Sequence, residues 1–208
     1  PGQPLAEFLG DPTEGCLLVA GEKCGINTDD IRGIFPRIAE IPFDSVRKRM
    51  TTVHKASRDY QGFKCGEIVS FTKGSIDGMI PLCSSVLLDG GAASIDNENI
   101  EKIRKAAEAL ASKGMRVLGI TMKKLDAAPE KVDESFENGL CFVGLAAMID
   151  PPRESVKGSI AIAREAGIHT VMITGDHPLT ASAIAASLNM AKHPEVLTGE
   201  HLNKMSPD

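Results

Sequence analysis

Apolar and polar residues alternate over several short runs in the first half of the chain, a pattern typical of half-buried strands. Such runs cover residues 37–43, 50–55 and 68–73, and polar or glycine-containing connections join them. Consecutive strands with connections of this kind pair antiparallel, so we expect a meander. A further strand is predicted over residues 115–122.

Helix-end signals lie before and between these strands. Asp11 precedes Pro12, a favourable first helical residue, and Glu14 is placed to complete a capping box. A helix is therefore predicted from Pro12 to about Gly21 or Gly25. Apolar residues at helical spacing predict a longer helix over 97–112 that ends at Gly114. Shorter helices are expected over 29–32 and 76–83.

The pattern changes near residue 140. Residues 140–149 form a continuous apolar strand, and Asp150-Pro151-Pro152-Arg153 follow as a stiff junction, because paired prolines fix backbone angles and remove two donors. Beyond it we predict a helix over 154–166, a strand over 168–174 and a helix over 178–190. Alternation of strand and helix is typical of a parallel α/β unit.

The expected fold class is therefore α/β in two parts. Residues 1–149 would form a domain with an antiparallel sheet flanked by helices, and residues 150–208 a partial Rossmann-like α/β unit. The chain starts without a methionine or a signal-peptide layout and ends abruptly, so we expect it to be cut from a longer protein.

Composition excludes several classes of function. The net charge is -5 with no basic block, and aromatic residues make up 4%, so we expect no nucleic acid partner. The 5 cysteines form no C-x-x-C pair and the histidines have no ligand spacing, so no metal site is predicted. The longest apolar run is about half of the ~20 residues that a membrane span needs.

Two turns carry residue types that suit phosphate chemistry. Thr174-Gly175-Asp176 follows a predicted strand and precedes a predicted helix, where free amides and the Thr174 hydroxyl suit a phosphate and Asp176 suits Mg²⁺. The alternative is an ordinary turn with Asp176 as the helix cap. Lys73-Gly74 ends a strand, where lysine suits a phosphate and glycine permits close approach; the alternative is a solvated turn.

Two further residues have a simpler interpretation when taken singly. Phe43 alone is most often a core residue, and Lys48 lies in Arg47-Lys48-Arg49, which alone is most often a solvated charge cluster.

Taken together, motifs across nearly the whole chain resemble those of P-type cation-transporting ATPases, in the same order. They are Gly10-Asp11-Pro12-Thr13-Glu14, the P-F-x-S-x-R-K-x-M pattern over 42–50, Thr72-Lys73-Gly74, Arg116-Val117-Leu118, Asp150-Pro151-Pro152-Arg153, and Met172-Ile173-Thr174-Gly175-Asp176. The wording of the second motif is closest to the calcium-pump branch.

The resemblance implies roles for these residues. Glu14 would bind the adenine amino group, Phe43 would stack on the ring, and Lys48, Lys73 and Gly74 would line the pocket. Arg116 would contact the phosphates, and Leu118 would form part of the pocket wall. Thr174, Gly175 and Asp176 would belong to the phosphoryl-transfer site, and residues 150–153 would form a hinge.

The resemblance also implies cofactors and partners. These are ATP and Mg²⁺, with the Mg²⁺ site mostly outside the chain, and the actuator, phosphorylation and transmembrane domains of the same protein. The chain would lie on the cytoplasmic face of a multi-pass membrane protein, and the transported cation would bind elsewhere.

The chain departs from the family pattern in two ways. Lys73-Gly74 continues as Ser75-Ile76-Asp77 where the family has Ala-Pro-Glu. The D-K-T-G-T segment with its nucleophilic aspartate and the G-D-G-x-N-D loop are absent from the sequence. We therefore expect ATP binding without turnover, missing first strands in the nucleotide domain, and an exposed sheet edge in the second unit that pairs with a neighbour.

Two other functions fit part of the sequence. A stand-alone haloacid-dehalogenase-like phosphatase would use the loop at 174–176 but needs its own nucleophilic aspartate in a D-x-D or D-x-T context at a strand end, and we find none there. A non-enzymatic nucleotide-sensing module would also bind ATP without turnover.

Overall fold

The computed structural model describes residues 11–89, 91–128, 133–149, 152–191 and 195–205. Gly10 of the first motif and Asp150 and Pro151 of the predicted junction lie outside these ranges. The chain divides into two compact units. Unit 1 comprises Pro1–Glu101 and Leu118–Ala146, and unit 2 comprises Lys102–Val117 and Ala147–Asp208.

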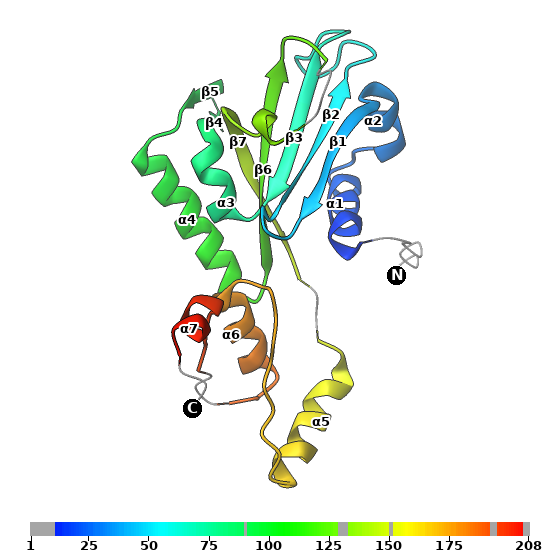
Figure 1. Ribbon diagram of the computed structural model, residues 1–208. Coiled ribbons are helices and arrows are strands. Elements are labelled where there is room, and N and C mark those ends of the chain that lie inside the picture. Colours follow the sequence, from blue (N-terminus) through cyan, green and yellow to red (C-terminus); the bar gives the residue numbers. More distant parts are fainter. Residues whose placement is uncertain (1–10, 90, 129–132, 150–151, 192–194, 206–208) are drawn as a thin grey trace. The chain divides into compact units, whose positions relative to one another are not determined.

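The described residues form a seven-stranded sheet with the order β1-β2-β3-β6-β7-β4-β5 (Figure 1). The strands are β1 (Arg37–Asp44), β2 (Arg49–Lys55), β3 (Ile68–Gly74), β4 (Cys83–Leu88), β5 (Gly91–Ser94), β6 (Arg116–Leu125) and β7 (Leu140–Met148). With helices flanking the sheet, the predicted α/β class is confirmed.

The meander predicted from alternation is confirmed, since β1, β2, β3 and β6 pair antiparallel in that order. Thr51 pairs with Thr72, and their hydroxyls lie 2.8 Å apart on a buried face of the sheet. Lys73 pairs with Met50 on the other face, because neighbouring strand positions alternate. The two faces therefore carry different chemistry.

Helices cover both faces. α1 (Pro12–Lys23) and α2 (Thr28–Ile34) lie on the face that carries Lys73, and α3 (Ile76–Met79), continued by the 3-10 turn Ile80–Leu82, lies on the other (Figure 1). The predicted cap of α1 is confirmed, because the Asp11 carboxylate accepts from the Thr13 amide at 2.8 Å. Glu14, expected to complete a capping box, forms an ion pair with Lys73.

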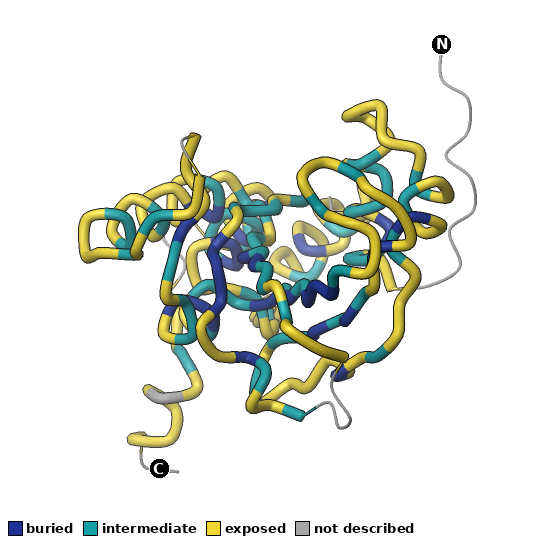
Figure 2. The backbone as a smooth tube through the Cα atoms, turned by 90° about the horizontal axis from the view of Figure 1, so that it is seen from above, coloured by how far each residue is buried: buried dark blue, intermediate teal, exposed yellow. Residues whose placement is uncertain are grey.

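The core of unit 1 follows the central strands, where buried positions gather in the tube of Figure 2. Val53, Val69 and Leu140 come from three of these strands, and Met79 comes from the end of α3. All four are completely shielded from solvent. The core of unit 1 is therefore built from the central strands together with α3.

The hairpin of β4 and β5 was not predicted. Leu88 pairs with Gly91, so the connection has two residues, and β4 also pairs in parallel with β7. Its sequence signal is the Asp-Gly pair at 89–90 after an apolar run, which is typical of a tight hairpin. The parallel pairing joins segments that are distant in the sequence, and no local pattern indicates it.

Helices dominate unit 2. It contains most of α4 (Asn97–Ala111), together with α5 (Glu154–Glu165), α6 (Pro178–Ser187) and the short α7 (Gly199–Lys204). The first three confirm predicted helices. The Thr180 hydroxyl donates to the Met115 carbonyl at 2.9 Å, which fixes α6 against the segment that follows α4.

The strand predicted over residues 168–174 is wrong, because this segment has an irregular backbone. Val171 and Ile173 are 81% and 93% exposed. A strand needs a neighbour to satisfy its backbone amides and carbonyls, and no segment that the structure describes pairs with this one. The apolar pattern of residues 168–174 was therefore not sufficient to predict a strand.

Within the described ranges, no helix has the length and apolar character required to cross a membrane.

Candidate functional site

The turn between β1 and β2 is built by Asp44. Its carboxylate accepts from the amides of Val46 and Arg47 at 2.9 and 2.8 Å, and its carbonyl accepts from the Lys48 amide at 2.6 Å. The bond from the Arg47 amide is the main reason that the pKa of Asp44 lies below its ordinary value. The turn holds Lys48 in the left-handed region, with φ of 53°, which is uncommon for a residue with a side chain.

Gly74 lies directly against this turn. A Cβ atom at position 74 would lie 2.6 Å from both the Arg49 Cβ and the Lys48 carbonyl oxygen. The next amide, of Ser75, donates to the same carbonyl at 3.0 Å. The Lys73-Gly74 pair and the turn that carries Lys48 are therefore one local structure, in which glycine is required for space.

Lys73 and Glu14 form an ion pair between β3 and α1. The Lys73 side chain is 18% exposed and that of Glu14 is 47% exposed. Burial lowers the pKa of Lys73, while the charge of Asp11 acts in the opposite direction. The pair presents both signs of charge at the end of the sheet.

Phe43 is 63% exposed, although it is a large aromatic residue. It precedes Asp44, the strand partner of Arg49, in a stretch where the pairing of β1 with β2 is irregular, so it lies near the end of β1 beside the turn that carries Lys48. Its interpretation as a core residue is wrong. The ring lies open to solvent at the edge strand.

Leu118 lies near the same end of the sheet. It is half-buried and precedes Gly119, the strand partner of Gly74. Unit 1 thus gathers Glu14, Phe43, Lys48, Lys73, Gly74 and Leu118 around the ends of β1, β2 and β3 and the adjoining part of β6.

Arg116 lies in unit 2, where it contacts the predicted phosphoryl-transfer loop. Its Nε and terminal nitrogen donate to one Asp176 oxygen at 3.0 and 2.8 Å, and the Thr174 hydroxyl donates to the other at 2.8 Å. Burial raises the pKa of Asp176, but the bonds from Thr174 and Arg116 outweigh burial and the pKa is lowered. Asp176 is therefore held as a carboxylate.

The rest of this loop differs from the simple-turn alternative. The cap of α6 is His177, whose ring nitrogen accepts from the Leu179 amide at 3.2 Å, and not Asp176. Gly175 has open space around the position of a Cβ atom. Of the predicted junction, Pro152 and Arg153 are exposed, and Arg153 is the N-cap residue of α5.

Glu137 was missed by the sequence analysis. It is 1% exposed and accepts from Arg47 at 2.8 Å, from Arg49 at 2.5 Å and from the Thr51 hydroxyl at 2.8 Å. Burial raises the pKa of Glu137, but these bonds outweigh it and the pKa lies below its ordinary value of 4.5. Nothing in the charged segment before β7 distinguishes this glutamate from its neighbours.

These contacts also correct the interpretation of Arg47-Lys48-Arg49 as a solvated cluster. The Arg47 and Arg49 side chains are 12% and 15% exposed, because both turn inward to Glu137. Lys48 between them is exposed.

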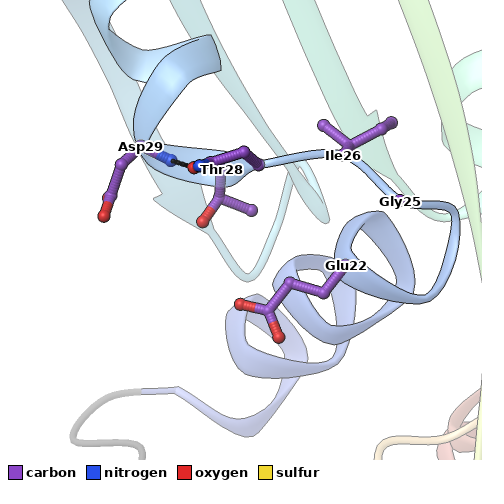
Figure 3. A pocket seen from close by; sticks show the side chains of 6 residues that line it. Glu22, Gly25, Ile26, Thr28 and Asp29 are labelled. Carbon is purple, nitrogen blue, oxygen red and sulfur yellow. Dashed lines mark hydrogen bonds between the residues drawn. The ribbon is translucent and has the colours of Figure 1, made fainter.

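A separate hollow of about 450 Å³ lies between α1 and α2 (Figure 3). It is lined by Glu22, Gly25, Ile26, Asn27, Thr28 and Asp29. Two of these six residues carry carboxylates and none is cationic, so the hollow does not suit a triphosphate.

Comparison with known sequences shows the family of this chain. The family described as "P-type ATPase, cytoplasmic domain N" matches residues 2–155. The chain belongs to the P-type ATPase family. This P-type ATPase chain is 41% identical over 97% of its length to "Calcium-transporting ATPase 1" of Lactococcus lactis, and 42% identical over 95% to "Calcium-transporting ATPase 1" of Bacillus cereus. It is 37% identical over 96% to "Calcium-transporting ATPase" of Bacillus subtilis.

The chain spans about a fifth of the length of these relatives, since the matches cover 22%, 21% and 22% of their sequences.

Proposed function

We propose that this chain binds ATP at the end of β1, β2 and β3, as the nucleotide-binding part of a cation-transporting pump. The observation that carries the proposal is the grouping of an exposed aromatic ring, Phe43, with the Lys73–Glu14 pair and Lys48. Adenine has an apolar face and a polar edge, which suit Phe43 and Glu14. A triphosphate needs cations, which Lys48 and Lys73 supply.

The proposal extends to the longer protein. That protein would hydrolyse ATP through an aspartyl phosphate, with Mg²⁺, and move a cation across a membrane, and calcium is favoured because the similar proteins are named calcium-transporting ATPases. The nucleotide domain would be residues 1–149, on the cytoplasmic face. Residues 150–208 would be part of the phosphorylation domain.

Unit 2 would supply the phosphoryl-transfer groups. Arg116 and Thr174 hold the carboxylate of Asp176, which suits Mg²⁺ or the orientation of a phosphoryl group. Gly175 would let a phosphate approach the backbone, and residues 150–153 would be the hinge. Mg²⁺ would supply charge neutralisation on the phosphates, with most of its ligands outside this chain.

ATP titration of the chain by calorimetry tests the proposal. We expect a Kd in the high-micromolar to millimolar range, or roughly -4 to -6 kcal/mol. Phe43→Ala should weaken binding by about 1–3 kcal/mol through the loss of base stacking. Val46→Ala truncates another exposed apolar residue of the same turn and serves as the control. An unchanged affinity in Phe43→Ala would remove Phe43 from the site.

The alternative functions make a different prediction for turnover. We expect phosphate release at background level, because the D-K-T-G-T nucleophile is absent from the sequence. Steady release that Asp176→Asn abolishes would favour a stand-alone phosphatase instead. The nucleotide-sensing alternative is separated from the pump by whether membrane segments flank this region in the longer protein.

A further inference from the structure

We propose that Glu137 is a positioning residue for the nucleotide site, which holds the β1–β2 turn so that Phe43 and Lys48 face the bound nucleotide. This inference rests on the ATP-binding function proposed above.

Glu137 joins two parts of the chain that are far apart in sequence. The Arg47 terminal nitrogen lies 2.8 Å from each of its carboxylate oxygens, the Arg49 Nε lies 2.5 Å from one, and the Thr51 hydroxyl donates to the other at 2.8 Å. Arg47 and Arg49 are also shielded from solvent. A buried carboxylate with this many charged donors fixes the geometry of its partners.

The contacts continue from Glu137 to the residues proposed to bind ATP. Arg47 also donates to the Pro42 carbonyl at 2.9 Å, which is the peptide that precedes Phe43. Arg49 donates to the Arg47 carbonyl at 3.3 Å, which is the peptide that precedes Lys48. Phe43 and Lys48 are therefore each directly adjacent to a carbonyl group that Arg47 or Arg49 bonds.

The conformation of Lys48 supports the same role. A left-handed lysine is strained, and such a residue persists only where its surroundings hold it. Here the flanking Arg47 and Arg49 both end on Glu137. Without the carboxylate, two buried guanidinium groups would repel each other, and the turn would lose the support that Arg47 and Arg49 add to the bonds made by Asp44.

The test is ATP titration of the 208-residue chain carrying Glu137→Gln, with folding checked by circular dichroism. The glutamine keeps the size of the side chain but cannot neutralise both arginines. We expect a Kd about fivefold or more weaker than that of the unsubstituted chain. Glu134→Gln is the matched control, because Glu134 also contacts Arg47, at 3.3 Å, but is 67% exposed; its Kd should stay within about twofold.

A second comparison separates positioning from general stability. If Glu137 acts through Phe43 and Lys48, the effect of Glu137→Gln should shrink when both of these residues are already alanine. An equal loss in both backgrounds would overturn the proposal, as would an unchanged Kd in folded Glu137→Gln. If Glu137→Gln does not fold, the Kd of Arg49→Lys is measured instead. This substitution removes one bond to the carboxylate and keeps the positive charge, and the same results support or overturn the proposal.

The unsubstituted chain distinguishes this inference from the function on which it depends. No ATP binding by that chain would overturn the proposed function and this inference with it. ATP binding that loss of the Glu137 contacts leaves unchanged would overturn this inference alone.

Discussion

Gly74 shows that a motif residue can be required for space alone. Its backbone is not in the left-handed region, so conformational freedom is not the reason for glycine. The reason is the turn that holds Lys48, whose backbone fills the position of a side chain. The sequence analysis singled out Lys73-Gly74 as a place where a phosphate could approach the backbone closely. Within the protein, the group that lies close to Gly74 is the turn that carries Lys48.

Gly74→Ala should therefore destabilise the protein. The added methyl group would have to displace the Lys48 carbonyl and the Arg49 Cβ, which we expect to cost about 1–3 kcal/mol in the free energy of unfolding. Urea denaturation measures the change. Gly33→Ala is the control, because a Cβ atom there meets nothing within 4 Å. Equal midpoints for the two variants would contradict the argument.

Residues differ in how far the sequence predicts them. Glu14, Phe43, Lys48 and Lys73 were predicted as site residues because each belongs to a motif, and the fold brings them to one end of the sheet. Glu137 was missed because its role depends on two arginines about ninety positions earlier. Pairing across that separation is a property of the fold, so local residue types carry no signal for it.

At the scale of elements, the pattern of apolar and polar residues predicted strands correctly where segments that follow one another in the sequence also pair in the sheet. The antiparallel strands β1, β2 and β3 follow one another directly, and their alternation was sufficient. Residues 168–174 have a comparable apolar pattern but no partner strand among the described residues. Strand propensity mainly reflects packing against neighbours, so a strand without neighbours does not form.

Hydrogen exchange should separate these two segments. We expect the amides of residues 171–173 to exchange faster than those of residues 69–71 in β3 by on the order of a thousandfold or more, since β3 lies between β2 and β6. Exchange monitored by NMR provides the measurement. Equal protection in both segments would contradict the irregular backbone. Protection of 171–173 that grows with protein concentration would indicate the predicted pairing with a neighbouring molecule.

At the scale of the whole molecule, each unit has a carboxylate held by arginine. Glu137 in unit 1 and Asp176 in unit 2 both have a lowered pKa, in spite of burial. His54 is different, because burial lowers its pKa and its ring accepts and donates as a neutral group between Phe35 and Thr52. All three groups bind protons less readily in the folded than in the unfolded chain.

Acid should therefore destabilise the protein in two steps. The unfolded chain binds more protons than the folded chain below each ordinary pKa, so stability is lost as pH falls. The loss should begin below about 6.5, the ordinary value for His54, and steepen below about 4.5, the ordinary value for Glu137. Urea midpoints from pH 8 to 3 measure both steps. His54→Gln should remove the first step and keep the second.

The order of strands in the sheet also affects synthesis of the chain. The β4–β5 hairpin leaves the ribosome well before β7, the strand that joins it to the rest of the sheet. A two-stranded hairpin is marginally stable alone. Until about fifty further residues have emerged, its apolar side chains have no lasting cover, and this interval is when a nascent chain most needs a chaperone.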